Sequence, residues 1–373
     1  MTNEQKEYIQ MIRKFAEKEI KPYVAQWDRE GTFPMDVYKK LFDMGIHLMD
    51  VPEEYGGLGL DRITSSMIHE ELARYDAGIA TTMGAVGLGF KPLTVAATPE
   101  QVQLFVDKII DGGFAAFALT EPGAGSDAGA VKTAAKLDGD EYVITGSKCF
   151  ITNAEYANIF TVIASTDKSK GVKGLSAFLV EADRPGITIG KEEDKMGIRT
   201  SNTCEIFFDE VRVPKNHLIG KEGDGFKIAM ITLDMARPVV GACSVGICQA
   251  CVDICTEYMK NRVQFGRPIA ALEGLQFILA DMEIATETAR AMVRAALQKM
   301  EDKEPYAVSA AVAKCYAGDM AMKVSTDAVQ ILGGYGYSKE YPVEKLMRDA
   351  KIFQIFEGTN QVQRVVIANN LLR

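Results

Sequence analysis

The feature that most limits how this chain can fold is a double change in its hydrophobic periodicity. In the first 110 residues the apolar side chains recur at helical spacing, as at Ile9 and Ile12. Short apolar or alternating runs separated by turn residues then follow, a pattern that is typical of strands. The helical period returns near residue 225 and persists to the end. We therefore expect a helical part at 1–113, an antiparallel β part at 114–220 and a second helical part at 221–373.

Within these three parts the predicted elements follow the same two periods. Helices are predicted at 4–28, 35–44, 62–74, 77–87, 99–110, 226–262, 274–300, 306–332, 341–354 and 360–371. Strands are predicted at 114–120, 131–137, 142–145, 159–164, 175–180, 204–208 and 211–213. Because proline removes an amide donor, we expect an interruption at Pro22 and a kink or restart of the long helix at Pro238.

Composition excludes several classes of protein. With 47% hydrophobic and 25% charged residues the chain resembles an ordinary soluble globular protein. The net charge is −9 and no basic block stands out, which argues against a nucleic-acid partner. The first residues lack the apolar core of a secretory signal and are too acidic for a transit peptide. No run of about 18 apolar residues is present, so we expect no membrane span and a cytoplasmic location.

The cysteines and histidines do not predict a metal site. Seven cysteines, an odd number, favour reduced thiols. Four of them show a spacing like the opening of an iron–sulfur motif, but they lie in a strongly helical stretch, which favours packed core thiols: Cys243, Cys248, Cys251 and Cys255. The three histidines are scattered without metal-ligand spacing: His47, His69 and His217.

The best candidate for chemistry is a carboxylate near the C-terminus. Glu357 lies among apolar residues such as Phe353 and Phe356, which tend to desolvate a carboxylate and raise its pKa. A raised pKa suits a base that abstracts a proton near neutral pH, and Gly358 allows close approach of another molecule. The alternative is structural: a helix ends at Gly358 and another begins at Thr359.

Three loops could hold a large ligand. Residues 120–127 combine glycines and hydroxyls after a predicted strand, so that backbone amides could cradle a phosphate or a flavin edge. Residues 262–268 carry two arginines suited to phosphate, and residues 330–337 are glycine-rich. Each loop also has a purely structural interpretation, as a turn, a basic helix end or an interhelical loop respectively.

Together the motifs resemble those of the acyl-CoA dehydrogenase family, over essentially the whole chain. They are Pro-Glu-Glu-Tyr-Gly-Gly-Leu-Gly (52–59), Leu-Thr-Glu-Pro-Gly-Ala-Gly-Ser-Asp (119–127), Phe-Ile-Thr-Asn (150–153), Phe-Asp-Glu-Val-Arg-Val-Pro (208–214), Arg-x-Gln-Phe-Gly (262–266), Gln-x-x-Gly-Gly-x-Gly (330–336) and Phe-Glu-Gly-Thr (356–359). The resemblance implies an α+β fold with a C-terminal four-helix bundle, bound FAD, an acyl-CoA substrate, electron-transfer flavoprotein as the electron acceptor, and a homotetramer built as a dimer of dimers.

The resemblance also implies the reaction. Glu357 would remove the α-proton of an acyl-CoA thioester while flavin N5 takes the β-hydride, giving the trans-2-enoyl-CoA. Its backbone N–H, with a ribityl hydroxyl of FAD, would hold the thioester carbonyl as in an oxyanion hole. In other branches of the family the base precedes the arginine of the long helix. Here Ala236 precedes Arg237, which favours Glu357.

By resemblance, further residues receive roles in binding. Those expected at the cofactor are Phe117, Leu119, Thr120, Gly125, Ser126, Phe150, Ile151, Thr152, Arg262, Gln264, Phe265, Glu273, Gln330, Ile331, Leu332, Gly333, Gly334, Thr359, Asn360 and Gln361. Those expected at the substrate are Ser126, Asp234, Arg237, Met83, Phe356 and Gly358, with Ile79, Ala80, Gly84 and Val240 also lining the acyl pocket. The residues from 262 to 265 and from 330 to 334 would act on the FAD of a neighbouring subunit.

One position departs from the family and three alternatives stay open. Glu273 stands where the family usually has Gln, which leaves that contact with FAD in question. The same site could run as an enoyl-CoA reductase, the chain could be a non-catalytic acyl-CoA or flavin-binding scaffold, or reduced flavin could react with oxygen as in acyl-CoA oxidases. The pocket residues favour short or medium acyl chains, including branched or cyclic ones.

Overall fold

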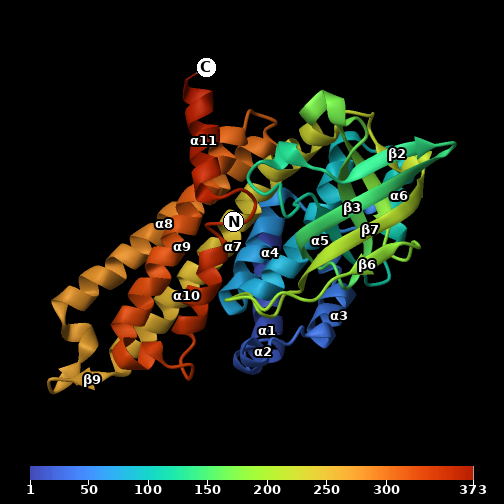
Figure 1. Ribbon diagram of the computed structural model, residues 1–373. Helices are drawn as coiled ribbons and strands as arrows, with labels where there is room; N and C mark the ends of the chain where they lie inside the picture. The colour runs from blue at the N-terminus through green and yellow to red at the C-terminus, as the bar shows by residue number, and fades with distance from the viewer. Residues whose placement is uncertain (373) are drawn as a thin grey trace.

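A computed structural model describes residues 1–372 of the chain (Figure 1). The helices are α1 (Asn3–Glu19), α2 (Val24–Glu30), α3 (Met35–Asp43), α4 (Arg62–Tyr75), α5 (Ala77–Ala96), α6 (Pro99–Asp107), α7 (Gly225–Asn261), α8 (Glu273–Glu301), α9 (Ala307–Leu332), α10 (Val343–Ile352) and α11 (Asn360–Leu371). The strands are β1 (Phe114–Ala118), β2 (Ala134–Asp138), β3 (Glu141–Thr152), β4 (Ala157–Ser165), β5 (Leu175–Glu181), β6 (Ile187–Ile189), β7 (Thr203–Pro214), β8 (Leu218–Ile219), β9 (Val263–Gln264) and β10 (Arg267–Pro268). The predicted order of helices, then strands, then helices is confirmed.

The three parts lie side by side, with the N-terminal helices α4 and α5 between the long C-terminal helices and the sheet (Figure 1). Helix α5 begins at the cap Asp76, whose Oδ1 accepts the Ile79 N–H at 2.8 Å. The helix was predicted to end at residue 87 but runs to Ala96, with Pro92 inside it. It continues because it packs on β1, where a Cβ at Gly89 would lie only 3.2 Å from Ala115.

The sheet is mixed rather than wholly antiparallel. Its strands run in the order β6-β7-β3-β2-β4-β5-β8, and β1 pairs with β4 off this path. Most neighbours are antiparallel as predicted, but β1 and β2 each pair with β4 in parallel. Between β1 and β4 the chain makes the β2–β3 hairpin and returns on the same side, which brings the two strands into parallel register. This non-local pairing leaves the end of β1 beside β3.

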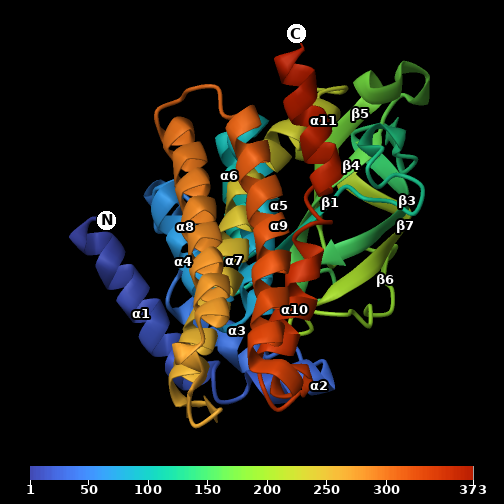
Figure 2. The same cartoon turned by 90° about the vertical axis from the view of Figure 1, so that its left-hand side faces the viewer.

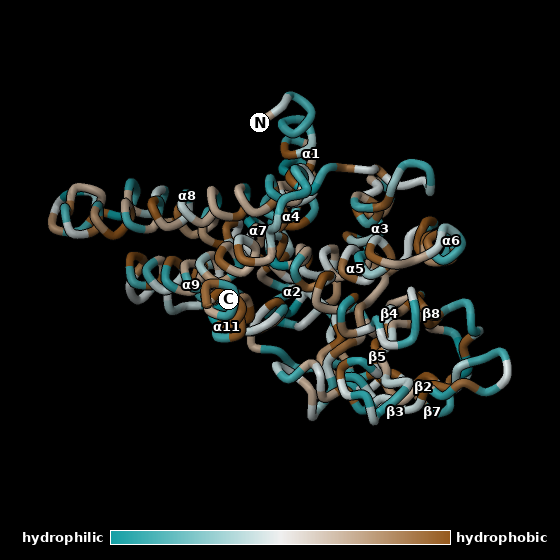
Figure 3. The backbone as a smooth tube through the Cα atoms, turned by 90° about the horizontal axis from the view of Figure 1, so that it is seen from above, coloured by the Kyte–Doolittle hydropathy of each residue, from teal (hydrophilic) through white to brown (hydrophobic). Residues whose placement is uncertain are grey.

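The C-terminal part is built around α7, which runs unbroken for 37 residues through Pro238. The expected restart at that proline does not occur, because contacts with α4, α8 and α9 outweigh the lost amide bond. Gly246 permits the close crossing of α4, since a Cβ there would lie 2.3 Å from Glu70 O. Figure 2 shows α7, α8 and α9 running together, and Figure 3 shows α8 and α9 reaching beyond the rest of the molecule.

Two helices, α5 and α7, are long and apolar enough to cross a membrane by length and composition. Of their most apolar windows, 56% and 72% respectively is buried inside the fold, which identifies them as core helices. The seven cysteines are free and buried. Burial raises the pKa of Cys243, Cys248 and Cys255 to about 12, so these thiols stay protonated within α7. Within residues 1–372 no group of three or more His, Cys, Asp or Glu side chains has the geometry of a metal site.

Candidate active site

Glu357 lies in the bend between α10 and α11, in an unusual backbone conformation. Its φ is +54° and that of Gly358 is +83°, so two successive residues are left-handed. A non-glycine residue in this region is strained and persists only where the surroundings hold it. Gly318 on α9 lets the bend come close, because a Cβ there would lie 2.6 Å from Phe353 O.

Two buried side chains hold the bend through its carbonyl oxygens. Lys314 Nζ on α9 donates to Gly358 O at 2.7 Å, and Gln363 Nε2 on α11 donates to Glu357 O at 3.1 Å and Gly358 O at 2.9 Å. Both side chains are fully buried. We call Lys314 and Gln363 the carbonyl clamp. Neither residue was predicted at the site, although a lysine next to Cys315 in an apolar stretch of a predicted helix is a signal in the sequence.

The Glu357 carboxyl group is enclosed and unsatisfied. Burial raises its pKa, against the lowering effect of three cations, Lys314, Arg237 and Lys91. Its Oε2 has no hydrogen-bond partner among residues 1–372. A buried acceptor without a partner is costly unless a ligand or water reaches it. The site therefore combines a carboxylate of raised proton affinity with one oxygen that the described chain leaves unpaired.

Arg237 stands close to this carboxylate from α7. Its guanidinium is 4% exposed, forms an ion pair with Asp234 one turn earlier, and leaves Nε without a partner in the described part of the chain. Ala236, the position of the rival base, carries no carboxyl group. Phe356 and Gly358, both predicted at the substrate, are the chain neighbours of Glu357. Asp234 and Arg237, also predicted there, form an ion pair on one face of α7.

Two segments with residues predicted at the cofactor, 117–120 and 150–152, come together where β1 ends beside β3, and we call them the wall. The Cys149 N–H donates to Thr120 O at 2.9 Å. Phe150 has a φ of +56° and is 66% exposed, so its ring faces solvent and does not pack in the core. Gly125 and Ser126 lie nearby in an exposed loop. The structure thus joins two segments that are thirty residues apart in the sequence into one wall.

A second lysine missed by the sequence analysis supports this wall. Lys148 is fully buried, and its Nζ donates to Leu119 O at 3.0 Å and to Glu121 Oε1 at 2.8 Å. Burial lowers the pKa of Lys148 to about 8 although Glu121 opposes the shift. Glu121 also accepts the N–H groups of Lys132 and Thr133. The loop that begins at Thr120 is therefore tied to β3 by a buried ion pair.

The remaining cofactor candidates form a separate cleft of about 730 Å³, which we call the distal cleft. Its lining includes Arg262, Gln264, Phe265, Gln330, Ile331, Leu332, Gly333 and Gly334. Phe265 has a φ of +52° and is 89% exposed, and Arg262 stacks over Tyr335 at 5.2 Å from the ring centre. Figure 1 places this end, marked by β9, at the opposite end of the long helices from α11.

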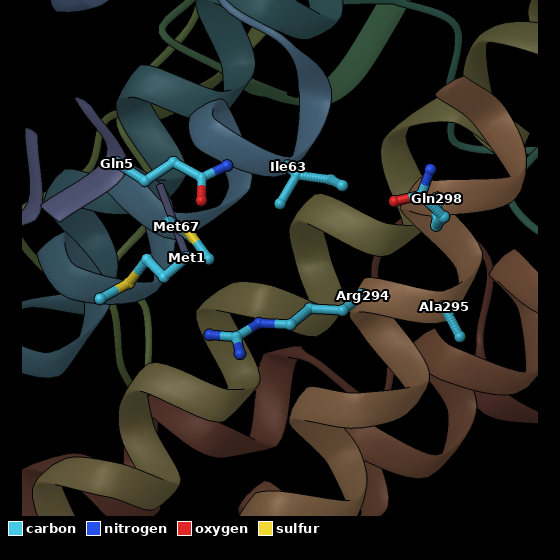
Figure 4. Close-up of a pocket in the computed structure, with 7 residues that line it drawn as sticks. All are labelled: Met1, Gln5, Ile63, Met67, Arg294, Ala295 and Gln298. Carbon is cyan, nitrogen blue, oxygen red and sulfur yellow. The ribbon is translucent and has the colours of Figure 1, made fainter. Parts of the chain in front are cut away.

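A single chain therefore does not bring all the predicted cofactor residues into one site. Glu273 begins α8, is exposed and does not line the distal cleft. Thr359 caps α11 and Gln361 is exposed beside it, so both stay at the bend. Asn360 is engaged inside the chain, because its side chain bonds Lys314, Cys315 O and Asp319. Its side chain is thus not free for a cofactor. A further groove of about 460 Å³ among α1, α4 and α8 contains none of the candidates (Figure 4).

The fold joins two helical parts and a mixed sheet, and burial raises the pKa of the Glu357 carboxyl group in the bend between α10 and α11. Three family models match the chain: acyl-CoA dehydrogenase N-terminal domain at 2–113, middle domain at 116–211 and C-terminal domain at 223–372. The chain belongs to the acyl-CoA dehydrogenase family, whose members are FAD-dependent flavoproteins.

Individual relatives are similar to this chain over nearly their full length. The short-chain specific acyl-CoA dehydrogenase of Megasphaera elsdenii is 46% identical, over 100% of this chain and 99% of the relative. The structure of butyryl-CoA dehydrogenase from the same organism has a TM-score of 0.97 at 45% identity, covering 100% of this chain and 99% of that one. A chain from a study of the electron transferring flavoprotein of Acidaminococcus fermentans and flavin-based electron bifurcation has a TM-score of 0.98 at 46% identity, with coverage of 100% and 99%.

The residues present fit FAD. In the distal cleft a Cβ added at Gly333 or Gly334 would meet nothing within 4 Å, so backbone amides are open to a ligand, and Arg262 supplies a cation suited to phosphate. At the wall, the exposed ring of Phe150 is suited to contact with a flat isoalloxazine ring. The enzyme is thus an acyl-CoA dehydrogenase with FAD as cofactor.

Proposed function

We propose that this enzyme removes the α-proton of a short-chain acyl-CoA with Glu357 and forms the trans-2-enoyl-CoA. The observation that carries the proposal is the enclosed Glu357 carboxyl group, whose pKa is raised by burial and whose Oε2 has no partner within residues 1–372. A base of raised pKa in an enclosed site is matched to a weakly acidic carbon next to a thioester carbonyl. Glu357 therefore fits the base better than any other carboxylate near the wall.

The other residues of the bend bind and orient the substrate. The Glu357 N–H donates to the thioester carbonyl and stabilises the negative charge that develops on it. Gly358 leaves room for the thioester, and Asp234 and Arg237 with Ser126 contact the CoA arm. FAD, when bound, accepts the hydride that leaves the β-carbon. The carbonyl clamp holds Glu357 and Gly358 in the left-handed conformation that points the carboxylate at the α-carbon.

We assign the wall and the distal cleft to two different FAD molecules. Residues 117–120, 125–126 and 150–152 contact the flavin bound by their own chain, while Arg262, Gln264, Phe265 and residues 330–334 contact the FAD of a neighbouring subunit. The distance between the two regions in one chain supports this division (Figure 1). A homotetramer, a dimer of dimers, supplies the neighbour. Thr359 and Gln361 bind near the FAD diphosphate at the start of α11, and Glu273 bonds a ribose or a partner residue.

The relatives support the proposed substrate length and electron acceptor. Likeness to short-chain specific and butyryl-CoA dehydrogenases supports a short acyl chain. The likeness to a chain studied with an electron transferring flavoprotein supports a partner of that kind. We place the enzyme in the cytoplasm, with parts 1–113, 114–220 and 221–373 as its three domains.

Anaerobic reduction of the flavin tests the proposal. The purified holoenzyme is mixed with butyryl-CoA and the flavin absorbance is followed. The wild type should bleach rapidly, whereas Glu357→Gln should retain FAD and bleach about 10²- to 10⁴-fold more slowly, because the proton has no acceptor. Glu283→Gln, an exposed carboxylate on α8, serves as the matched control. Full-rate bleaching by Glu357→Gln would refute the base assignment.

A further inference from the structure

A buried lysine behind the wall fixes the direction of one peptide group. Lys148 on β3 is fully buried, and its Nζ donates to Leu119 O at 3.0 Å and to Glu121 Oε1 at 2.8 Å. A trans peptide is planar, so its C=O and its N–H point in opposite directions. The peptide that joins Leu119 to Thr120 is trans. Because its carbonyl oxygen points inward to Lys148, the Thr120 N–H points outward.

The N–H of Thr120 is left without a partner at this position. It makes no hydrogen bond within residues 1–372, whereas the next peptide group is engaged at both ends. Thr120 O accepts the Cys149 N–H at 2.9 Å, and the Glu121 N–H donates to Ala124 O at 3.2 Å. Thr120 is only half-buried, so its amide lies at an accessible edge of the wall. A fixed and unpaired backbone amide of this kind is a donor for a ligand.

A β-bulge places the exposed ring of the wall next to this amide. Between Lys148 and Ile151, β3 carries one residue more than the strand it pairs with, β7. Phe150 lies in the bulge with a φ of +56° and is 66% exposed. The backbone N–H that bonds Thr120 O comes from the same bulge. The wall therefore exposes a ring and an amide donor, and Lys148 lies behind them in the interior.

Lys148 also polarises the peptide that it holds. Burial lowers the pKa of Lys148 to about 8 against the raising effect of Glu121, so the ammonium keeps its proton at pH 7. A cation that donates to a peptide C=O strengthens the N–H of the same peptide as a donor, because hydrogen bonds in a chain polarise one another. Glu121 neutralises the cation and accepts the N–H groups of Lys132 and Thr133. The pair has no net charge, so its effect on a ligand passes through the Thr120 amide.

We propose that Lys148 is a positioning residue for the cofactor, which holds the peptide between Leu119 and Thr120 so that the Thr120 N–H donates to the polar edge of the flavin ring. This inference rests on the proposed function, because it assumes that the wall contacts the flavin bound by the same chain. The hydride taken from the β-carbon adds negative charge to the flavin, and hydrogen bonds to its ring tune its electronics. A donor that is fixed beforehand stabilises this charge without reorganisation. Reduced flavin should therefore gain more from the Thr120 N–H than oxidised flavin does.

The test measures the midpoint potential of the flavin in the FAD-loaded enzyme at pH 7, by equilibration with a reference dye. This potential reports the ratio of the affinities for reduced and oxidised flavin. The double variant Lys148→Met with Glu121→Gln keeps the pair neutral and leaves no lone charge buried. Because the peptide loses its anchor, the ratio should fall about tenfold, the worth of one hydrogen bond to a charged group. For a two-electron couple this is a potential lower by about 30 mV.

Two controls separate positioning from charge and from general damage. Glu121→Gln alone keeps the bond from Lys148 to Leu119 O and should not lower the potential, because a cation without its carboxylate favours negative charge on the flavin. Lys136→Met removes an exposed lysine from β2, outside the wall, and should keep the wild-type potential.

The inference and the proposed function fail in different ways. A wild-type potential in the double variant would overturn the inference, as would Kd values for oxidised and reduced FAD that rise by the same factor. Either result would leave the proposed function intact. Failure of butyryl-CoA to bleach the wild-type flavin would overturn the proposed function, and the potentials of the variants would still decide the role of Lys148.

Discussion

The bend around Glu357 and the distal cleft around Arg262 differ in how much of their surroundings one chain supplies. At the bend, the carbonyl oxygens of Glu357 and Gly358 accept hydrogen bonds from buried side chains, and the carboxylate is enclosed. At the distal cleft, Phe265 is 89% exposed and the Arg262 guanidinium stacks over the ring of Tyr335. Both regions hold non-glycine residues with positive φ, but only the first holds its strained residue with its own side chains.

This difference assigns the proton transfer to the bend and the retention of FAD to the distal cleft. A base needs its position held within a fraction of an ångström, and the enclosed bend provides this within one chain. An exposed side chain at a cofactor site contributes binding free energy only when the ligand is bound to it. We therefore expect changes at the bend to alter stability and rate in each subunit, and changes at the distal cleft to alter FAD binding and assembly.

The largest effect is expected from the buried charge that anchors α10, the helix leading into the bend. Lys345 Nζ bonds Asp76 at 2.8 Å and Asp349 at 2.5 Å, and all three are buried. Lys345→Met should destabilise the enzyme by about 3–5 kcal/mol, because two buried carboxylates lose their shared cation. Denaturant unfolding of the FAD-free protein measures the loss.

A surface pair provides the control for this prediction. Arg212 bonds Asp138 at 2.8 Å, and both side chains are more than half exposed. Arg212→Met should leave the free energy of unfolding nearly unchanged, because water screens the pair. Equal losses in the two variants would show that the buried charges do not anchor the enclosed region.

The next effect is a loss of rate with a shift in pH dependence, on removal of half of the carbonyl clamp. Lys314→Met should lower kcat by about hundredfold, since a small displacement of the base has effects of that size. The Lys314 cation lowers the pKa of Glu357 against the raising effect of burial. Without it that pKa rises, and since the base must be ionised, kcat/KM should begin to fall at a higher pH as the solution is acidified.

Two other cations face Glu357 and remain in this variant, Arg237 from α7 and Lys91 from α5, so ionisation is weakened rather than abolished. Lys314→Arg should restore the pH profile in part, and Lys323→Met, an exposed lysine on the same helix, should leave it unchanged. A Lys314→Met enzyme that is slower at every pH with an unshifted profile would limit the residue to a structural role.

A smaller effect, on cofactor rather than on rate, is expected at the distal cleft. Arg262→Ala should weaken FAD retention by roughly 10- to 100-fold, the worth of a hydrogen bond to a charged group. The flavin that stays bound should be reduced by butyryl-CoA at the wild-type rate. Equilibrium dialysis and stopped-flow bleaching separate the two quantities, with Lys260→Ala as an exposed control on α7. A slower bleaching rate at full FAD occupancy would break the proposed division.

The sequence predicted the local half of this organisation. The α, β, α order and most strands follow from periodicity, and the bend at Glu357 follows from a carboxylate beside a glycine. What it did not predict depends on contacts between distant residues. The parallel pairing of β1 with β4 and the unbroken α7 at Pro238 are set by tertiary packing, which overrides local preference.

The same limit applies to the site. Lys314 and Gln363 are ordinary polar residues in helical stretches, and their roles appear only when α9 and α11 meet the bend. Asn360, which the resemblance placed at the cofactor, uses its side chain in bonds inside the chain, to Lys314 and to Cys315 O. In both cases the bonding partners depend on the direction of the side chain in the folded chain, which a sequence pattern does not contain.

The smallest effect, and the sharpest separation of the two regions, should come from Phe265. Because its ring is 89% exposed in the single chain, Phe265→Ala removes little buried surface there. The free energy of unfolding of the FAD-free protein should change by no more than about 0.5 kcal/mol, whereas FAD retention should fall several-fold as the ring loses its contact with a neighbour's cofactor. At the enclosed bend no comparable substitution can leave stability untouched, since every side chain that holds it is buried. If Phe265→Ala destabilised the lone chain as much as it weakened FAD binding, the exposed ring would already have a partner within its own subunit, and the distal cleft would be as complete in one chain as the bend.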